Sequence, residues 1–394
     1  MCQRTESVKP DAKGSLDERN LVNGYRPELD VVRCLAFFLV FAHHFLLLTR
    51  VCVSFPCPSR TVGLDNERLF IAFRDLCSLG LCLFFCLSGY LINCLLLDER
   101  ARNGLVSVRK FYIRRVLRIW PLYFLGIIIG TAIAILLHQK EEIIGFIWFL
   151  FFAGNFYSGR FNNPMLPLWS ISIEEQFYLI WPWIMRWVSH KGLFACVGLL
   201  FVVANATLFI LGQHHVDPGR VAWGNTFVQF EMFASGILLA LLRKPASVHR
   251  PLLGSAFAFA GLVVWFISCF LFHPNPVVGT ETAANGAQLI AGYGFIALGC
   301  AAILQGFCMI GPTYMPRPLI NLGRISYGLY VYHVLVSEIT LALVNPGNRF
   351  ISIGISGVLS LFGTICVAAI SYAYLERPFL KLKRRFEVLH TRPI

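Results

Sequence analysis

The stretch at residues 30–49, DVVRCLAFFLVFAHHFLLLT, has the length and apolar content of a membrane-spanning helix, yet it carries Arg33 near one end and His43 and His44 toward the other. An ionisable side chain at the centre of a spanning helix costs about 2.5 to 3.5 kcal/mol, so these groups need partners within a larger membrane domain. Arg33 and His44 are eleven residues apart, about 16 Å along a helix, and are expected on similar sides of it. The segment therefore predicts a membrane fold with a polar site inside it.

The rest of the chain has the composition of a polytopic membrane protein. Of its 394 residues, 57% are hydrophobic and 14% are charged, and the mean hydropathy is +0.65. These values exclude an ordinary soluble domain. Apolar runs of near-spanning length recur at 31–49, 70–97, 112–137, 172–189, 193–212, 226–242, 252–272, 286–310, 321–344 and 351–375. We expect an all-α integral membrane protein with about ten transmembrane helices in a single bundle.

A further apolar run, 143–156, is only fourteen residues long, a length typical of an interfacial or re-entrant segment. Loop charges support this interpretation, because Lys and Arg concentrate on the cytoplasmic side of short loops. The most basic loop contains Arg100, Arg102, Arg109, Lys110, Arg114, Arg115 and Arg118. If 143–156 does not cross, the other basic clusters lie on the same side, and both termini are predicted to be cytoplasmic.

Three regions are expected along the chain. Residues 1–24 are polar and predict a disordered cytoplasmic tail, 25–380 a transmembrane domain, and 381–394 a basic cytoplasmic tail. The net charge of +13 is explained by membrane orientation and anionic lipid, and no nucleic-acid partner is expected. The cysteines at 77–94 lack a compact CxxC pair, so no metal site is predicted. Cys52 and Cys57 are predicted to lie on the outer side of the membrane, either joined in a disulfide or as free thiols.

The motif LWSISIEEQFYLIWP, 168–182, has two interpretations. Ser172 could cap a helix whose first turn contains Glu174 and Glu175, since acidic residues suit a helix N-terminus. The capping interpretation does not explain the density of polar and aromatic groups around this pair. The alternative is a functional site, which would also include Ser170.

Three other motifs are candidates. In GLCLFFCLSGYLI, 80–92, Ser88 and Gly89 predict close helix packing, and the surroundings do not suit a nucleophile. In FYIRRVLRIWP, 111–121, the i, i+3 spacing of Arg115 and Arg118 suits phosphate binding and equally suits anchoring in lipid head groups. In ISYGLYVYHVL, 325–335, the tyrosines suit an interfacial belt, and His333 is expected to be a buried histidine with its polar atoms satisfied.

Taken in order, these motifs resemble the membrane-bound acyltransferase 3 family. The matching stretches are RPELDVVR with His44 eleven residues after Arg33, GLCLFFCLSGYLI, RRVLRIWP, LWSISIEEQFYLIWP, ISYGLYVYH and SYAYLERPF, and they run from residue 26 to residue 379. The resemblance implies transfer of an acyl group, often acetyl, from acetyl-CoA or another acyl-CoA to a hydroxyl on a sugar, a lipid-linked glycan or a similar acceptor. It also favours a bacterial inner membrane. One departure is Cys82, where many relatives have an acidic residue.

Carried onto this sequence, the resemblance assigns Arg33 and His44 to the family's first helix and Arg115 and Arg118 to its arginine pair. Ser170, Glu174 and Glu175 fall in its serine and glutamate motif.

The chemistry of these residues agrees with acyl transfer. His44 is predicted to be the general base, with His43 as its rival, because an imidazole suits removal of a hydroxyl proton. Arg33 is predicted to belong to the catalytic site. Together with Arg115 and Arg118, it is also predicted to bind the phosphates of the donor. Glu174 is predicted to orient His44.

Ser170, Glu175, Tyr330 and His333 are predicted to support the site or to contact substrate. Glu231 and Glu338 are further intramembrane carboxyl groups that need a partner.

Two alternatives stay open. One is an acyltransferase acting on a small lipophilic natural product. The other is a proton-coupled transporter or flippase, with Arg33, His44 and Glu174 as a proton relay. Transporters often contain inverted repeats with paired broken helices, and the sequence has no such pairing, which favours the enzyme.

Overall fold

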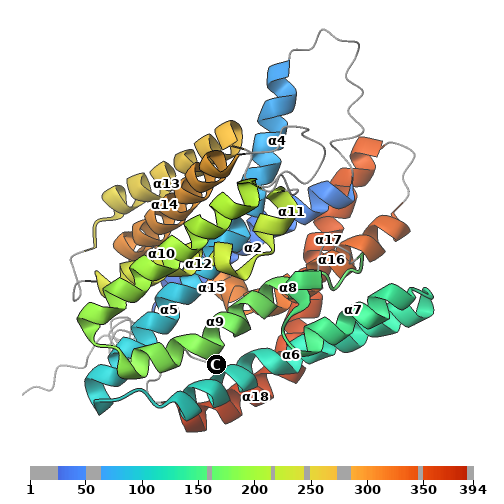
Figure 1. Cartoon of the computed structure of the whole chain (residues 1–394). Coiled ribbons are helices and arrows are strands. Elements are labelled where there is room, and N and C mark those ends of the chain that lie inside the picture. The colour runs from blue at the N-terminus through green and yellow to red at the C-terminus, as the bar shows by residue number, and fades with distance from the viewer. Residues whose placement is uncertain are drawn as a thin grey trace, which may run out of the picture.

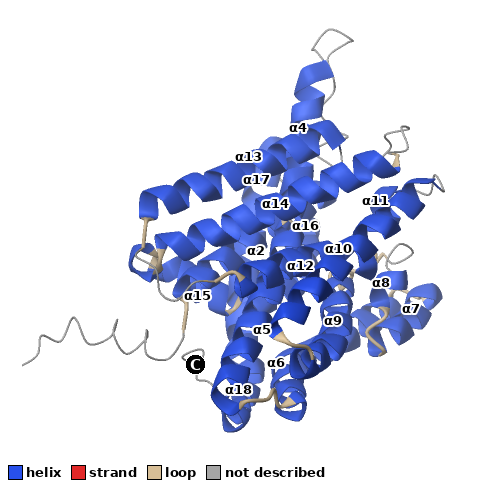
Figure 2. Cartoon of the chain, turned by 60° about the vertical axis from the view of Figure 1, so that its left-hand side comes forward, coloured by secondary structure: helices blue, strands red, loops and turns tan. Residues whose placement is uncertain are grey.

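The computed structural model describes residues 25–49, 64–157, 162–213, 218–243, 249–272, 285–344 and 349–387 (Figure 1). Over this part of the chain it contains helices and connecting loops without a strand (Figure 2), as predicted. The helices are α2 (Pro27–Leu48), α4 (Leu64–Ser78), α5 (Gly80–Asn103), α6 (Val108–Leu136), α7 (Lys140–Leu150), α8 (Gly154–Tyr157), α9 (Leu168–Trp187), α10 (His190–Gln213), α11 (Pro218–Trp223), α12 (Thr226–Leu241), α13 (Pro251–Phe272), α14 (Gly286–Ile310), α15 (Arg317–Arg324), α16 (Ser326–Leu343), α17 (Arg349–Ser371) and α18 (Arg377–Lys383). The predicted tail at 1–24, the Cys52 and Cys57 pair and residues 388–394 lie outside the described residues.

Each of the ten predicted apolar runs is helical in the structure. Within the described ranges, seven helices are long and apolar enough to cross a membrane, which makes the chain an integral membrane protein. The other three runs form α9, α12 and α16. Of these, α12 has only 16 residues, and α9 and α16 carry polar residues of the candidate site described below.

The segment at 143–156 does not form a spanning helix, as predicted. It forms the 11-residue helix α7, a turn and the four-residue helix α8. Eleven helical residues rise about 16 Å, roughly half the thickness of the hydrocarbon core. Tyr123 on α6 holds the turn by donating a hydrogen bond to the carbonyl oxygen of Phe149 at 2.7 Å, and Gln176 on α9 donates to that of Phe152 at 2.7 Å.

Helix α5 is central to the bundle. In the apolar part of the continuous helical stretch Ile71–Asn103, 78% of the residues are buried, against 22% in the apolar part of α10, of α13 and of the stretch that contains α17. Glycines let α12 lie directly against α5: a Cβ at Gly89 would overlap the carbonyl oxygen of Phe233, and one at Gly236 would overlap that of Cys86. This close contact fixes the position of α5, which forms one wall of the site.

The basic end of the bundle is tied together around Arg114, at the start of α6. Its guanidinium donates to the carboxylate of Glu99 at the end of α5, at 2.9 Å, and to the carbonyl oxygen of Phe386 beyond α18, at 3.2 Å. The end of α5, the start of α6 and α18 accordingly lie together at the lower end of the molecule in both views (Figures 1 and 2).

Candidate active site

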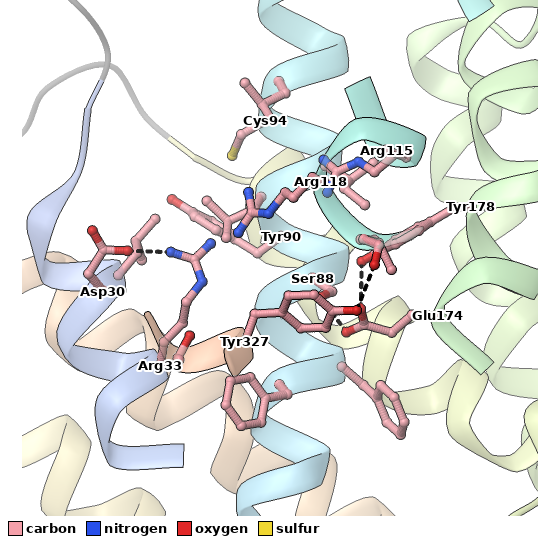
Figure 3. A pocket seen from close by; sticks show the side chains of 18 of the residues that line it. Asp30, Arg33, Ser88, Tyr90, Cys94, Arg115, Arg118, Glu174, Tyr178 and Tyr327 are labelled. Atoms are coloured by element: carbon pink, nitrogen blue, oxygen red, sulfur yellow. Dashed lines mark hydrogen bonds and ion pairs between the residues drawn. The ribbon is translucent and has the colours of Figure 1, made fainter. Parts of the chain in front are cut away.

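A cavity of about 190 Å³ lies between α2, α5, α6, α9 and α16. Five arginines and three carboxyl residues line it, so its wall carries an excess of positive charge. Figure 3 shows Arg33 extending from α2 and Arg118 from α6 toward each other across this space. The cavity therefore brings together six site residues that the sequence predicted, from four helices that are distant in the chain: Arg33, Arg115, Arg118, Ser170, Glu174 and Tyr330.

Arg33 is held by its own helix. Its guanidinium pairs with Asp30 one turn earlier, and the Asp30 side chain is 1% exposed. The second carboxylate oxygen of Asp30 accepts from the hydroxyl of Tyr25 at 2.7 Å, and Arg324 on α15 donates to that hydroxyl at 3.2 Å. Burial, together with the neighbouring Asp30, raises the pKa of Tyr25 to about 12, so Tyr25 stays protonated and able to donate at neutral pH.

Arg115 lies against aromatic rings on two helices. Its guanidinium carbon is 5.1 Å from the ring centre of Tyr178 on α9 and 5.4 Å from that of Phe111 on α6. Such contacts orient an arginine and leave its N–H groups free to bind an anion. Arg118 follows one turn later on α6 and also lines the cavity, as the i, i+3 spacing predicts.

Glu174 lies on the opposite wall. Its two carboxylate oxygens accept from the hydroxyl of Ser88 on α5 at 2.7 Å and from that of Tyr178 at 3.1 Å (Figure 3). The capping interpretation is wrong, because α9 begins at Leu168 and its first turn contains no acidic residue. Packing is not the main role of Ser88 either, since its side chain binds Glu174 and lines the cavity.

Glu175 points to a different neighbour. One of its carboxylate oxygens accepts from the indole nitrogen of Trp120 on α6 at 3.1 Å. It is not among the residues that line the cavity. The adjacent glutamates therefore have separate surroundings, and Glu174 is the one that lines the cavity.

Ser170 and Tyr330 meet at the inner end of the cavity. Their hydroxyl oxygens are 2.7 Å apart, and the carbonyl oxygen of Pro167 lies 3.0 Å from that of Ser170 and 3.2 Å from that of Tyr330, so one hydroxyl donates to the other and the second donates to the carbonyl. Both residues are buried and line the cavity. The ring of Tyr330 has the ring of Phe84 on one side, at 5.9 Å between centres, and that of His333 at 5.6 Å. Tyr330 therefore separates the arginine-lined space from the histidines.

His44 lies beyond Tyr330 and is not among the residues that line the cavity. Its Nδ1 is 3.1 Å from Nε2 of His333 and 3.0 Å from the carbonyl oxygen of Val40. Glu174 does not bond to His44: in the described part of the chain, the hydrogen bonds of Glu174 go to Ser88 and Tyr178 alone. The contact expected between Glu174 and His44 is therefore not formed, and His333 takes its place.

His43 faces away from this pair. Its Nδ1 is 3.1 Å from the carbonyl oxygen of Arg74 on α4, and its ring is 6% exposed. Arg74 forms a buried ion pair with Asp75 at 2.8 Å. His43 thus joins α2 to α4, which is a structural role, while His44 is the histidine that points toward α16.

Comparison with known proteins identifies the family of the chain. Residues 26–373 match the family model described as an acyltransferase domain. The chain belongs to the acyltransferase 3 family. It is similar to the peptidoglycan O-acetyltransferase OatA of Listeria monocytogenes serovar 1/2a, with 26% identity over 91% of this chain and 56% of that protein. It is also similar to nodulation protein 10 of Rhizobium leguminosarum bv. viciae, with 26% identity over 77% of this chain and 82% of that protein.

The chain spans about half the length of the first curated relatives that it matches. No solved structure gives a significant match. Membership of the acyltransferase 3 family, which the ordered motifs predicted, is thus confirmed by the family model and by relatives whose names include O-acetyltransferases.

For this family member, the sequence reasoning missed several residues of the cavity. Arg26 lines it, pairs with Glu28 at 2.7 Å and lies over the ring of Tyr90, 5.9 Å from its centre. Arg243, at the end of α12, also lines it and pairs with Asp98 at 2.9 Å. Their one sequence signal is a basic residue at a helix end on the same predicted membrane side as Arg115 and Arg118.

Proposed function

We propose that the protein is a membrane O-acyltransferase that moves an acetyl group from acetyl-CoA, or another acyl group from its acyl-CoA, to a hydroxyl. The proposed acceptor is a sugar or a lipid-linked glycan, in keeping with relatives such as the peptidoglycan O-acetyltransferase. One observation carries the proposal. A cavity rich in arginine lies at one end of α2, and His44 lies further along the same helix beside the inner end of that cavity.

The arginines support a phosphorylated donor. Guanidinium groups bind phosphate through paired N–H donors, and Arg33 from α2 and Arg115 and Arg118 from α6 reach the cavity from two helices. Arg26 and Arg243 add two more positive charges at its wall. Coenzyme A carries its phosphates at one end and the thioester at the other, so its head would bind among the arginines and its arm would extend toward Tyr330.

The histidine supports transfer to a hydroxyl. In the proposed reaction, Nε2 of His44 takes the proton of the acceptor hydroxyl as its oxygen attacks the thioester carbonyl carbon. A carbon–oxygen bond forms, the carbon–sulfur bond breaks, and the departing thiolate takes the proton from His44. The products are the O-acyl ester and coenzyme A with a free thiol. Ser170 and Tyr330, with a shared hydrogen bond beside the path of the donor, would orient the carbonyl group.

The direction of approach follows from the loop charges. The end of α12 with Arg243, at the mouth of the cavity, belongs to the set of basic helix ends that the positive-inside rule places in the cytoplasm. We therefore propose that the donor enters from the cytoplasm, that both termini are cytoplasmic, and that the protein resides in a bacterial inner membrane. The acceptor would approach His44 from the membrane or from the outer side.

Thioester cleavage tests this function. Purified protein in nanodiscs would receive acetyl-CoA and a lipid-linked glycan extract, and free thiol would be measured for wild type, His44→Ala and the matched control His43→Ala. We expect thiol release that requires the extract and is lost in His44→Ala. Mass spectrometry of the extract then identifies the acceptor. Equal release by wild type and His44→Ala would refute the histidine base, and a protein that neither cleaves nor binds acetyl-CoA would support the transporter alternative.

A further inference from the structure

His333, on α16, is fully buried, and both of its ring nitrogens have hydrogen-bond partners. Its Nδ1 is 2.6 Å from the carbonyl oxygen of Tyr330 in the preceding turn, and its Nε2 is 3.1 Å from Nδ1 of His44. The same Nδ1 of His44 is 3.0 Å from the carbonyl oxygen of Val40. The contact between the two imidazoles thus joins α16 to α2, and each histidine also bonds to a backbone carbonyl of its own helix.

These contacts determine where the protons are. A carbonyl oxygen only accepts hydrogen bonds, so the nitrogen that faces it must carry the proton. Nδ1 of His333 and Nδ1 of His44 are therefore protonated. In its neutral form His333 has its lone pair on Nε2, which accepts from Nδ1 of His44, so the single Nδ1 proton of His44 is shared between this nitrogen and the carbonyl oxygen of Val40. Neutral His44 then has its own lone pair on Nε2, the nitrogen that is left to act as a base.

We infer that His333 is a positioning residue that holds His44 in this tautomer and stabilises it once protonated. The inference rests on the proposed function, in which His44 takes a proton. In a Ser-His-Asp triad, a carboxylate holds the tautomer of the histidine and stabilises its protonated form. In the described part of this chain, the side chain that bonds to Nδ1 of His44 is the neutral His333, and Glu174 bonds elsewhere.

The effect of His333 should grow during the reaction. When Nε2 of His44 receives the proton of the acceptor, its ring becomes an imidazolium, and the hydrogen bond from Nδ1 to His333 becomes charge-assisted and stronger. The surroundings favour this, because a hydrogen bond is stronger where the local dielectric is low. The ring of Phe37 lies edge-on to His333, with 6.2 Å between centres, and the other titratable groups beside the pair are His43 and Tyr330.

Two substitutions separate positioning from packing. His333→Gln can place its side-chain oxygen near the position of Nε2 and still accept from His44, whereas His333→Leu fills similar space without an acceptor. With the full chain in nanodiscs and acetyl-CoA as donor, we expect His333→Leu to lower kcat about tenfold or more, the loss of one charge-assisted hydrogen bond. KM for acetyl-CoA should stay within about twofold, because the arginine cavity is untouched. His333→Gln should retain most of the activity.

If the two variants lose kcat equally, or if His333→Leu is as active as wild type, the inference is overturned. A second measurement does not depend on activity. Nitrogen NMR of ¹⁵N-histidine protein, with His44→Ala and His333→Ala used to assign the signals, should show a protonated Nδ1 and an unprotonated Nε2 in both residues. A His44 with its proton on Nε2 would overturn the inference about His333 without contradicting acyl transfer. Thioester cleavage that persists in His44→Ala would contradict the proposed function at a different point, because it would show that His44 is not the base.

Discussion

Asp30 connects two cavity-lining residues of the same segment: one of its carboxylate oxygens binds Arg33 and the other accepts from Tyr25. Asp30 is buried, so Arg33 has a fixed position at the cavity wall. We expect Asp30→Asn to release Arg33 and to raise KM for acetyl-CoA about tenfold or more, since a charge-assisted contact contributes about 1.5 to 3 kcal/mol.

The matched control for Asp30 is Asp98→Asn, which breaks the half-exposed pair with Arg243. Exposed pairs contribute about 0 to 1 kcal/mol, so this control should raise KM by less than about fivefold. Steady-state kinetics on both variants makes the comparison. Equal effects on KM would mean that donor binding depends on the total charge of the cavity and not on the fixed position of Arg33.

The arginine pair on α6 gives a second prediction. Arg115→Gln and Arg118→Gln should each raise KM for acetyl-CoA about tenfold or more, with lysine at either position only partly effective, because lysine lacks the planar fork of donors. Arg109→Gln is the control, since Arg109 is exposed at the start of the same helix. If Arg109→Gln raises KM as much as the other two, the positive end of α6 acts through long-range charge alone.

Ser88 offers a test of the opposite wall. Ser88→Ala removes one of the two donors to Glu174, and we expect it to lower kcat/KM about threefold to tenfold, the effect of one lost hydrogen bond of about 1 kcal/mol. Ser235→Ala removes a buried serine that donates to the carbonyl oxygen of Glu231 on α12, outside the cavity. It should leave kcat/KM unchanged, and a matching loss there would indicate a general packing defect.

The contact between α5 and α12 predicts a stability effect. Gly236→Ala places a methyl group against the carbonyl oxygen of Cys86, and overpacking of this kind costs about 1 to 3 kcal/mol. Gly198→Ala on α10 has open space around the added Cβ and should be neutral or slightly stabilising, since alanine favours helix. When thermal unfolding is measured in detergent, Gly236→Ala should have a lower Tm than wild type, and Gly198→Ala should not. A similar Tm in both variants would contradict the close helix contact.

Tyr25 predicts a change in stability at high pH. Its pKa is raised by burial and by Asp30 from an ordinary value of about 10 to about 12. The protonated form is therefore favoured by folding, so this contribution is complete below about pH 10 and is lost as the pH rises through about 12. Between these values Tm should fall more steeply for wild type than for Tyr25→Phe. Parallel curves would show that the pKa of Tyr25 is not raised in the folded protein.

The helices could be predicted from the sequence because hydropathy is a local property. Ten apolar runs became helices, and the fourteen-residue run at 143–156 formed only short ones. The positions of Arg33, Arg115 and Arg118 also followed from local spacing. The hydrogen-bond partners of the polar groups could not be predicted in this way. Glu174 was expected beside His44, yet it bonds to Ser88, 86 residues earlier.

The partner of His44 is even more distant, since His333 lies 289 residues away in the chain. Such pairings depend on how the helices pack, and a single sequence does not report packing. The close contact of α5 with α12 at Gly89 and Gly236 is an example, because it decides which face of α5 presents Ser88 to α9.

The separation of Arg33 from His44 along α2 has a consequence for the choice of donor. Eleven residues of helix place them about 16 Å apart. A thioester with a short carrier, such as an acylated cysteamine, could meet His44 but would leave the arginines without a ligand, whereas a free nucleotide would meet only the arginines. In the proposed reaction, helix α2 would therefore select donors by length, because a carrier whose anionic head and thioester are separated by about this distance would engage both ends at once.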